Sequence, residues 1–99
     1  MKYLVRMDVS IPHDMPAHQR AETLRREKEY SQELQRDGRW VSIWRVVGQY
    51  ANYSVFDVES HDELHGLLQG LPLFPFMDLE VTALATHPSD VAASVDVAT

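Results

Sequence analysis

The stretch from residue 40 to residue 58, WVSIWRVVGQYANYSVFDV, decides the fold of this chain. It contains both tryptophans of the protein, and its two halves are rich in Val, Ile, Tyr and Phe. These residue types fit a pleated, half-buried surface. The halves are separated by GQYAN at residues 48–52, a break typical of a turn. The stretch therefore predicts a hairpin of two strands, residues 40–47 and 52–58.

Polar side chains are distributed along this apolar hairpin. They are Arg45, Gln49, Tyr50, Asn52 and Ser54. An apolar wall with a few fixed hydrogen-bonding groups is typical of a small-molecule pocket. The alternative is a hairpin whose arginine and asparagine simply face water, because exposed polar residues are common on half-buried strands.

Two more strands and a long helix are predicted around the hairpin. Residues 3–11 and residues 77–85 alternate apolar and polar side chains, which indicates strands. Residues 17–37 are rich in helix-forming residues, and Gly38 directly after them suits a helix C-terminus. The sequence therefore places a helix between the first strand and the hairpin.

A second helix is predicted after the hairpin. Ser60 and Glu63 form a capping-box pattern ahead of leucines at helical spacing, and Gly70 and Pro72 end this helix. The next residues, Leu-Phe-Pro-Phe at 73–76, are too proline-rich for a helix or a central strand. We predict a short apolar loop there.

The predicted order of elements is β-α-β-β-α-β. This is an α+β pattern, the split βαβ arrangement of the ferredoxin-like fold, with a four-stranded antiparallel sheet and two helices on one face. The opposite face of such a sheet is uncovered. Simple alternation along the first hairpin strand puts Trp40 and Trp44 on one face and Val41 and Ile43 on the other. Because both faces are apolar, we predict a homo-oligomer formed by sheet-face contact.

Composition narrows the class of protein. The chain has 99 residues, a net charge of −6 and 44% apolar residues, which fits one globular domain and argues against nucleic acid as a partner. We expect the domain to span residues 1–90 and a weakly patterned tail to span 91–99. No apolar run approaches the ~20 residues of a membrane span, and no signal segment is expected. Zero cysteines exclude thiolate chemistry and suit a cytoplasmic location.

The first helix lacks the apolar filling that a helix on a sheet normally has. Its middle turns present Glu27, Lys28 and Ser31 at positions where large apolar side chains are expected. Two explanations are open: the helix packs only through its ends, with a solvated face between them, or polar groups are held over the sheet for a function.

Several long motifs resemble those of one family. They are ELQRDGRW at 33–40, IWRVVGQYANYSVFDV at 43–58, LPLFPFMDLEV at 71–81 and HPS at 87–89. Over about residues 1–90 the chain resembles muconolactone Δ-isomerase. The resemblance implies a ferredoxin-like subunit of a ring-like homo-oligomer, a decamer in the family, with active sites near subunit boundaries. It also implies cofactor-free conversion of muconolactone to 3-oxoadipate enol-lactone, in the catechol branch of the β-ketoadipate pathway.

The chemistry of that reaction predicts the catalytic roles. A base must remove a carbon-bound proton and return it two carbons away, and donors must stabilise the dienolate oxygen. Glu27 is the predicted base, because partial burial beneath the helix would raise its pKa. Asp8, Glu22 and His18 are weaker candidates. The alternative role of Glu27 is a surface residue paired with Arg20 or Tyr30.

The substrate carboxylate requires a cation and the lactone ring requires dry walls. Arg45 suits bidentate capture of the carboxylate, and Lys28 could either pair with Glu27 or polarise the lactone carbonyl. Tyr50 and Asn52 are predicted donors to the dienolate oxygen, and Ser31 a further contact. The predicted apolar walls are Trp40, Trp44, Phe56, Phe74 and Phe76.

Two other functions compete with the isomerase. A chloromuconolactone dehalogenase would use the same proton removal and expel chloride, and the sequence does not separate the two. A non-catalytic ferredoxin-like oligomer has no need for charges over its sheet. His61 and His65 have a metal-compatible spacing, but no third ligand follows, and no Gly-x-Ser-x-Gly motif supports a serine nucleophile. We therefore expect no metal site and no cofactor.

Overall fold

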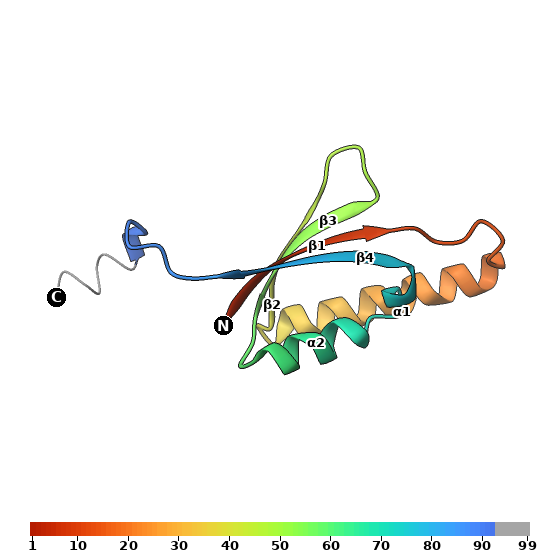
Figure 1. Cartoon of the computed structure of the whole chain (residues 1–99). Coiled ribbons are helices and arrows are strands. Elements are labelled where there is room, and N and C mark those ends of the chain that lie inside the picture. Colours follow the sequence, from red (N-terminus) through yellow and green to blue (C-terminus); the bar gives the residue numbers. More distant parts are fainter. Residues whose placement is uncertain (93–99) are drawn as a thin grey trace.

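The chain folds as a four-stranded antiparallel sheet with both helices on one face, as Figure 1 shows. The computed structural model describes residues 1–92. The strand order is β2-β3-β1-β4, and this arrangement confirms the predicted α+β, ferredoxin-like fold. In chain order the elements are β1 (Lys2–Val9), α1 (Ala17–Arg36), β2 (Trp40–Arg45), β3 (Ala51–Asp57), α2 (His61–Gln69), the 3-10 helix η1 (Phe74–Phe76) and β4 (Met77–Leu84).

The C-terminus of α1 and the N-terminus of α2 form as the sequence predicts. After α1, Gly38 takes a φ of 88°, and the N–H groups of Gly38 and Arg39 donate to the carbonyls of Gln35 and Leu34. This is the Schellman arrangement, which favours glycine because its backbone is left-handed there. At the start of α2, Ser60 Oγ accepts from the Glu63 N–H at 3.0 Å.

One predicted loop is wrong. Residues 74–76 form the 3-10 helix η1, with a proline in its first turn. Proline does not disturb a helix at that position, because the N–H it lacks would have no partner there. The predicted tail, residues 91–99, lies outside the described residues except for 91 and 92, and the boundary at residue 90 stays a prediction.

A β-bulge in β2 changes which of its side chains share a face. The pairing of β2 with β3 shifts between Trp40 and Ser42. The bulge adds one residue, so the alternation of faces changes phase within the strand. Trp40, Ile43 and Arg45 consequently face the helices, whereas Trp44 lies on the open face. The prediction that Trp40 and Trp44 share a face is therefore wrong.

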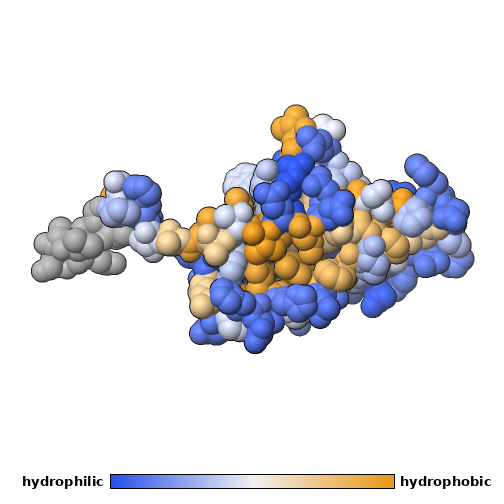
Figure 2. Space-filling model, in the orientation of Figure 1, coloured by the Kyte–Doolittle hydropathy of each residue, from blue (hydrophilic) through white to orange (hydrophobic). Residues whose placement is uncertain are grey.

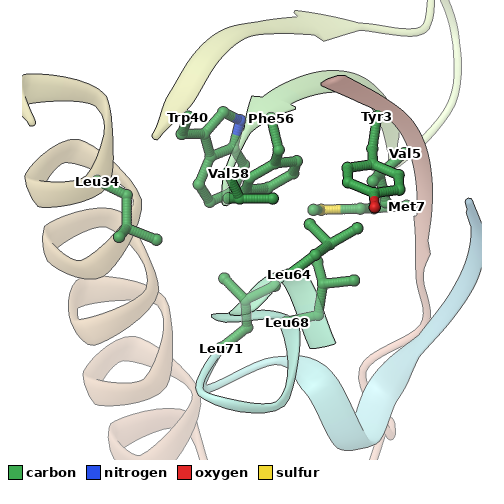
Figure 3. Close-up of a cluster of buried hydrophobic side chains, with 10 residues drawn as sticks. All are labelled: Tyr3, Val5, Met7, Leu34, Trp40, Phe56, Val58, Leu64, Leu68 and Leu71. Carbon is green, nitrogen blue, oxygen red and sulfur yellow. The ribbon is translucent and has the colours of Figure 1, made fainter. Parts of the chain in front are cut away.

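The core fills the space between sheet and helices. Figure 3 shows side chains from all of β1, β2, β3, α1 and α2, and from the residues just after β3 and α2, converging there. Trp40 and Phe56 are the largest of the side chains that are less than 2% exposed, and the centroids of their rings lie 4.7 Å apart. Leu34 is the single fully buried residue of α1. The core therefore holds α1 by its C-terminal end, and the preceding turns lie over the sheet with polar side chains.

The surface of the chain has many exposed apolar side chains. Trp44 is 70% exposed and Val47, at the tip of the hairpin, is 94% exposed. Figure 2 shows apolar side chains gathered between β4 and α2, where Val81 is also exposed. Within residues 1–92, no helix is both long enough and apolar enough to cross a membrane.

Candidate active site

A pocket of about 240 Å³ lies between α1 and the end of the sheet where the hairpin turns. It forms where α1 is not packed by large apolar residues, so the polar turns of the helix face the strands across an open space. Its lining comes from α1, all three of β1, β2 and β3, the hairpin loop, and the segment around η1. The lining residues are Met7, Val9, Leu24, Glu27, Lys28, Ser31, Trp40, Ile43, Arg45, Tyr50, Asn52, Leu73 and Met77.

Glu27 is the carboxylate of this pocket. Its Oε1 accepts a hydrogen bond from the Leu73 N–H at 2.9 Å, which fixes the carboxylate between α1 and the start of η1. Its Oε2 has no hydrogen-bond partner within residues 1–92. Burial raises the pKa of Glu27 above its ordinary value, and the bond from Leu73 partly offsets this rise because it favours the ionised form. The pocket thus holds one oriented carboxylate with a free oxygen.

Two cations line the same pocket without an acidic partner. Lys28 and Arg45 form no ion pair with any residue in the described part of the chain, whereas Arg6, Arg25 and Arg39 each pair with a carboxylate. The Arg45 guanidinium carbon lies 5.3 Å from the centre of the Tyr50 ring. This cation–π contact holds the guanidinium beside the turn of the hairpin. Two unpaired cations beside a single carboxylate make this pocket suited to an anionic ligand.

Uncharged polar groups complete the lining. Tyr50 and Asn52 come from the hairpin, on either side of buried Ala51, and both reach the pocket. Asn52 Oδ1 accepts a hydrogen bond from Ser54 at 2.8 Å. Ser31 Oγ donates to the Lys28 carbonyl of its own helix at 3.0 Å. The tyrosine hydroxyl and the asparagine amide are therefore two uncharged groups of the lining that can donate to a ligand oxygen.

Comparisons with known proteins identify the family. A family model described as muconolactone delta-isomerase matches residues 1–90. The chain belongs to the muconolactone delta-isomerase family. It is 64% identical over 91 residues to a muconolactone delta-isomerase of Cupriavidus pinatubonensis, covering 92% of this chain and 99% of that protein. A relative with the same name from Rhodococcus opacus is 61% identical over 87 residues, covering 88% and 94% of the two chains.

A solved structure of the family has the same fold. The crystal structure of a muconolactone isomerase superposes with a TM-score of 0.88 at 49% identity, over 92% of this chain and 95% of that chain. These findings confirm the predicted resemblance and the predicted enzyme class, an isomerase. They leave no support for a non-catalytic binding module.

The pocket brings together most of the residues predicted for an isomerase of this family. All four predicted catalytic residues and two of the predicted substrate contacts, Ser31 and Arg45, line it together with Trp40. The predicted catalytic residues are Glu27, Lys28, Tyr50 and Asn52. Their roles remain predictions, but their convergence from α1 and from the β2–β3 hairpin supports treating them as one site.

Four predicted wall residues lie elsewhere in the chain. Trp44 is exposed on the opposite face of the sheet, because the bulge turns it away from the helices. Phe56 is buried in the core against Trp40, so it supports a wall of the pocket from behind. Phe74 packs against the core and Phe76 lies half-buried in η1; neither lines the pocket.

The walls are instead aliphatic and thioether side chains that sequence reasoning missed. Met7 and Val9 come from the helix-facing side of β1, and Ile43 from the same face of β2. Leu73 and Met77 flank η1, where their position depends on a helical turn that the sequence did not reveal. Alternation along β1 is the signal that would have found Met7 and Val9.

The weaker candidates for the base are occupied elsewhere. Asp8 pairs with Arg6 at 2.9 Å on the open face of the sheet, and Glu22 pairs with Arg25 at 2.6 Å on the exposed side of α1. His18 is exposed in the first turn of α1 and does not line the pocket. Glu27 pairs with neither Arg20 nor Tyr30 within residues 1–92, and its one hydrogen bond there is the one from the Leu73 N–H.

The histidine pair of α2 lies away from this pocket. His61 Nδ1 is hydrogen-bonded to the Tyr3 hydroxyl, and the two rings meet edge to face. Within residues 1–92, no group of three or more histidine, cysteine or acidic side chains could hold a metal ion.

Proposed function

We propose that the chain converts muconolactone to 3-oxoadipate enol-lactone in the catabolism of aromatic compounds, without a cofactor. The observation that carries this proposal is the pocket in which one half-buried carboxylate lies beside two cations that have no acidic partner. A lactone with a carboxylate arm needs both a base and a cation. Membership of the muconolactone delta-isomerase family supports the same substrate.

Glu27 is the proposed base. Its free Oε2 removes the proton from the ring carbon that bears the carboxymethyl arm, and the C–H electron pair moves into the ring. The ring double bond shifts toward the carbonyl carbon, and the carbonyl oxygen of the lactone takes up the negative charge of the dienolate. Glu27 then returns the proton to the carbon next to the carbonyl. A carboxylate whose pKa is raised by burial is better suited to this shuttle, because it holds the proton between the two steps.

The remaining polar groups bind and stabilise charge. Arg45 is the proposed partner of the substrate carboxylate, since its planar guanidinium can form two parallel hydrogen bonds. Tyr50 and Asn52 are proposed to donate to the dienolate oxygen, where hydrogen bonds strengthen as charge develops. Lys28 contributes positive charge to the same pocket, either at the carbonyl or at the carboxylate.

We also propose that the chain acts as a homo-oligomer, as the family resemblance implies, in the cytoplasm. Exposed apolar side chains on the open face and at the edges of the sheet support self-association, among them Trp44, Tyr53 and Leu84. Sedimentation of the purified protein is expected to give a mass several times the 11.4 kDa of one chain. A monomer at micromolar concentration would contradict this proposal.

An activity assay tests the proposed reaction directly. Purified protein is given muconolactone in D₂O with a metal chelator present, and the reaction is followed by ultraviolet absorbance and proton NMR. Fast isomerisation with proton transfer at the two ring carbons is expected. A parallel assay with a chlorinated muconolactone measures chloride release. Fast chloride release with poor isomerisation would assign the chain to dehalogenation, and neither activity in a folded protein would overturn the proposal.

The pH dependence of kcat/KM provides an independent measurement. A general base works only when it is deprotonated, so activity is expected to fall as the pH drops through the pKa of Glu27 in the free enzyme. Because burial raises that pKa, the acid limb is expected above 4.5, the ordinary value for glutamate. Circular dichroism over the same pH range shows that the fold persists. A profile that stays flat down to pH 4 would contradict a buried carboxylate base.

A further inference from the structure

Ser54 is a buried hydroxyl in the middle of the sheet. Its side chain is 0% exposed, the only polar residue among the fully buried residues of the described chain. On the neighbouring strands it pairs with Val5 of β1 and Ile43 of β2, both apolar. A hydroxyl costs free energy in such surroundings unless it is hydrogen-bonded, and an alanine would fit the position without that cost. Its presence calls for a function.

The hydroxyl of Ser54 binds a residue of the pocket. Ser54 Oγ donates to Asn52 Oδ1 at 2.8 Å. The two residues are two positions apart on β3, so their side chains lie on the same face of the sheet. Ser54 itself does not line the pocket, whereas Asn52 does. The bond therefore joins the buried core to a group that can touch the ligand.

This bond determines which end of the Asn52 amide is available. An asparagine amide has an acceptor oxygen on one branch and an N–H₂ donor on the other. With Oδ1 held by the Ser54 hydroxyl, the N–H₂ branch is the one left free on the pocket side. A developing dienolate oxygen needs a donor, and an amide turned the other way would present a repelling oxygen.

We propose that Ser54 is a positioning residue of the isomerase, which holds the Asn52 amide with its N–H₂ group turned toward the dienolate oxygen. This inference rests on the proposed function of Asn52 and extends it to a residue that never touches the substrate. Because the donor acts most strongly when the oxygen is charged, Ser54 should affect kcat more than KM.

The test is a double-mutant cycle of Ser54→Ala and Asn52→Ala on the full-length protein. Ser54→Ala is expected to lower kcat about tenfold, because a free amide rotates away from its productive orientation, with KM changed less than about twofold. Asn52→Ala is expected to lower kcat by at least as much. In the Asn52→Ala background, removing the Ser54 hydroxyl should have no further effect on kcat, since Ser54 then has nothing to position.

Matched variants separate positioning from folding. Ser54→Cys leaves no cavity, because its side chain is slightly larger than serine, and it replaces the hydroxyl by a weak donor. It should therefore reproduce the loss in kcat even if Ser54→Ala proves poorly folded. Ser42→Ala removes a strand serine that pairs on the open face of the sheet, and should leave kcat unchanged. The midpoint of the acid limb of kcat/KM should stay the same in the Ser54 variants, because Glu27 is untouched.

Each remaining outcome has a definite meaning. If Asn52→Ala has normal kcat, Asn52 is no donor to the dienolate, and both its proposed role and the inference fail. If Asn52→Ala is slow while Ser54→Ala is normal, the role of Asn52 stands and the inference alone is overturned. Losses that multiply in the double variant, or a change in KM alone, would likewise show that Ser54 does not act through Asn52.

Discussion

Glu27→Gln is expected to lower kcat by about 10²- to 10⁴-fold, the usual contribution of a positioned general base. The amide cannot accept the proton, so isomerisation loses its shuttle. The substitution is otherwise conservative, because the Gln carbonyl oxygen can still accept the hydrogen bond that Leu73 N–H gives to Oε1. Steady-state kinetics on muconolactone measure the effect, and sedimentation and circular dichroism show whether the variant keeps the size and fold of the parent.

The same substitution is expected to lower activity but not to lower stability at neutral pH. Burial raises the pKa of Glu27, so the stability that the group contributes is fully present below its unfolded pKa and is lost as the pH rises through its folded pKa. At neutral pH the ionised carboxylate therefore costs folding free energy, and a neutral glutamine does not. The Tm of Glu27→Gln should equal or exceed that of the parent at pH 7, and the difference should shrink toward pH 4.

Glu22→Gln is the matched control. It makes the same change on the same helix, but Glu22 has a 55% exposed side chain paired with Arg25 and lies outside the pocket. Its kcat should stay within about twofold of the parent, because exposed ion pairs contribute little. Normal turnover by a folded Glu27→Gln variant would remove Glu27 from the role of base. A loss of similar size in Glu22→Gln would show that the effect is not specific to the pocket.

The fold could be predicted from the sequence because its local signals agree with one another. Strand alternation, a glycine after α1 and a serine cap before α2 each specify one boundary, and the structure places all three within about two residues. The polar middle of α1 also indicated where the pocket lies. Glu27, Lys28 and Ser31 lie where a packed helix would have large apolar residues, and that gap is the pocket.

The walls of the pocket could not be predicted, because they depend on one inserted residue and one turn. A strict period of two places Trp40 and Trp44 together and puts Arg45 on the other face from Trp40. The bulge between Trp40 and Ser42 reverses this, and it is invisible to alternation because it adds a residue without breaking the β-rich composition. The proline of η1 similarly reads as a loop, although it occupies a helix start.

Arg45→Ala is expected to raise KM for muconolactone by about 10- to 100-fold, since hydrogen bonds to charged groups contribute about 1.5–3 kcal/mol each. The substrate carboxylate is bound equally in the ground state and the transition state, because it does not take part in the proton transfer. Uniform binding of that kind changes KM and leaves kcat within a few-fold of the parent. The bulge in β2 gives this residue access to the pocket, so the experiment also tests the functional importance of the bulge.

Two further variants distinguish a carboxylate clamp from a loss of positive charge. Arg45→Lys keeps the charge but cannot form two parallel bonds, so its KM should lie between those of Arg45→Ala and the parent. Lys28→Ala removes the second of the two pocket cations that have no acidic partner. If KM rises more in Lys28→Ala than in Arg45→Ala, the substrate carboxylate binds Lys28 instead. An unchanged KM in Arg45→Ala would rule out Arg45 as the partner of the substrate carboxylate, because an anion that loses a bidentate partner also loses affinity.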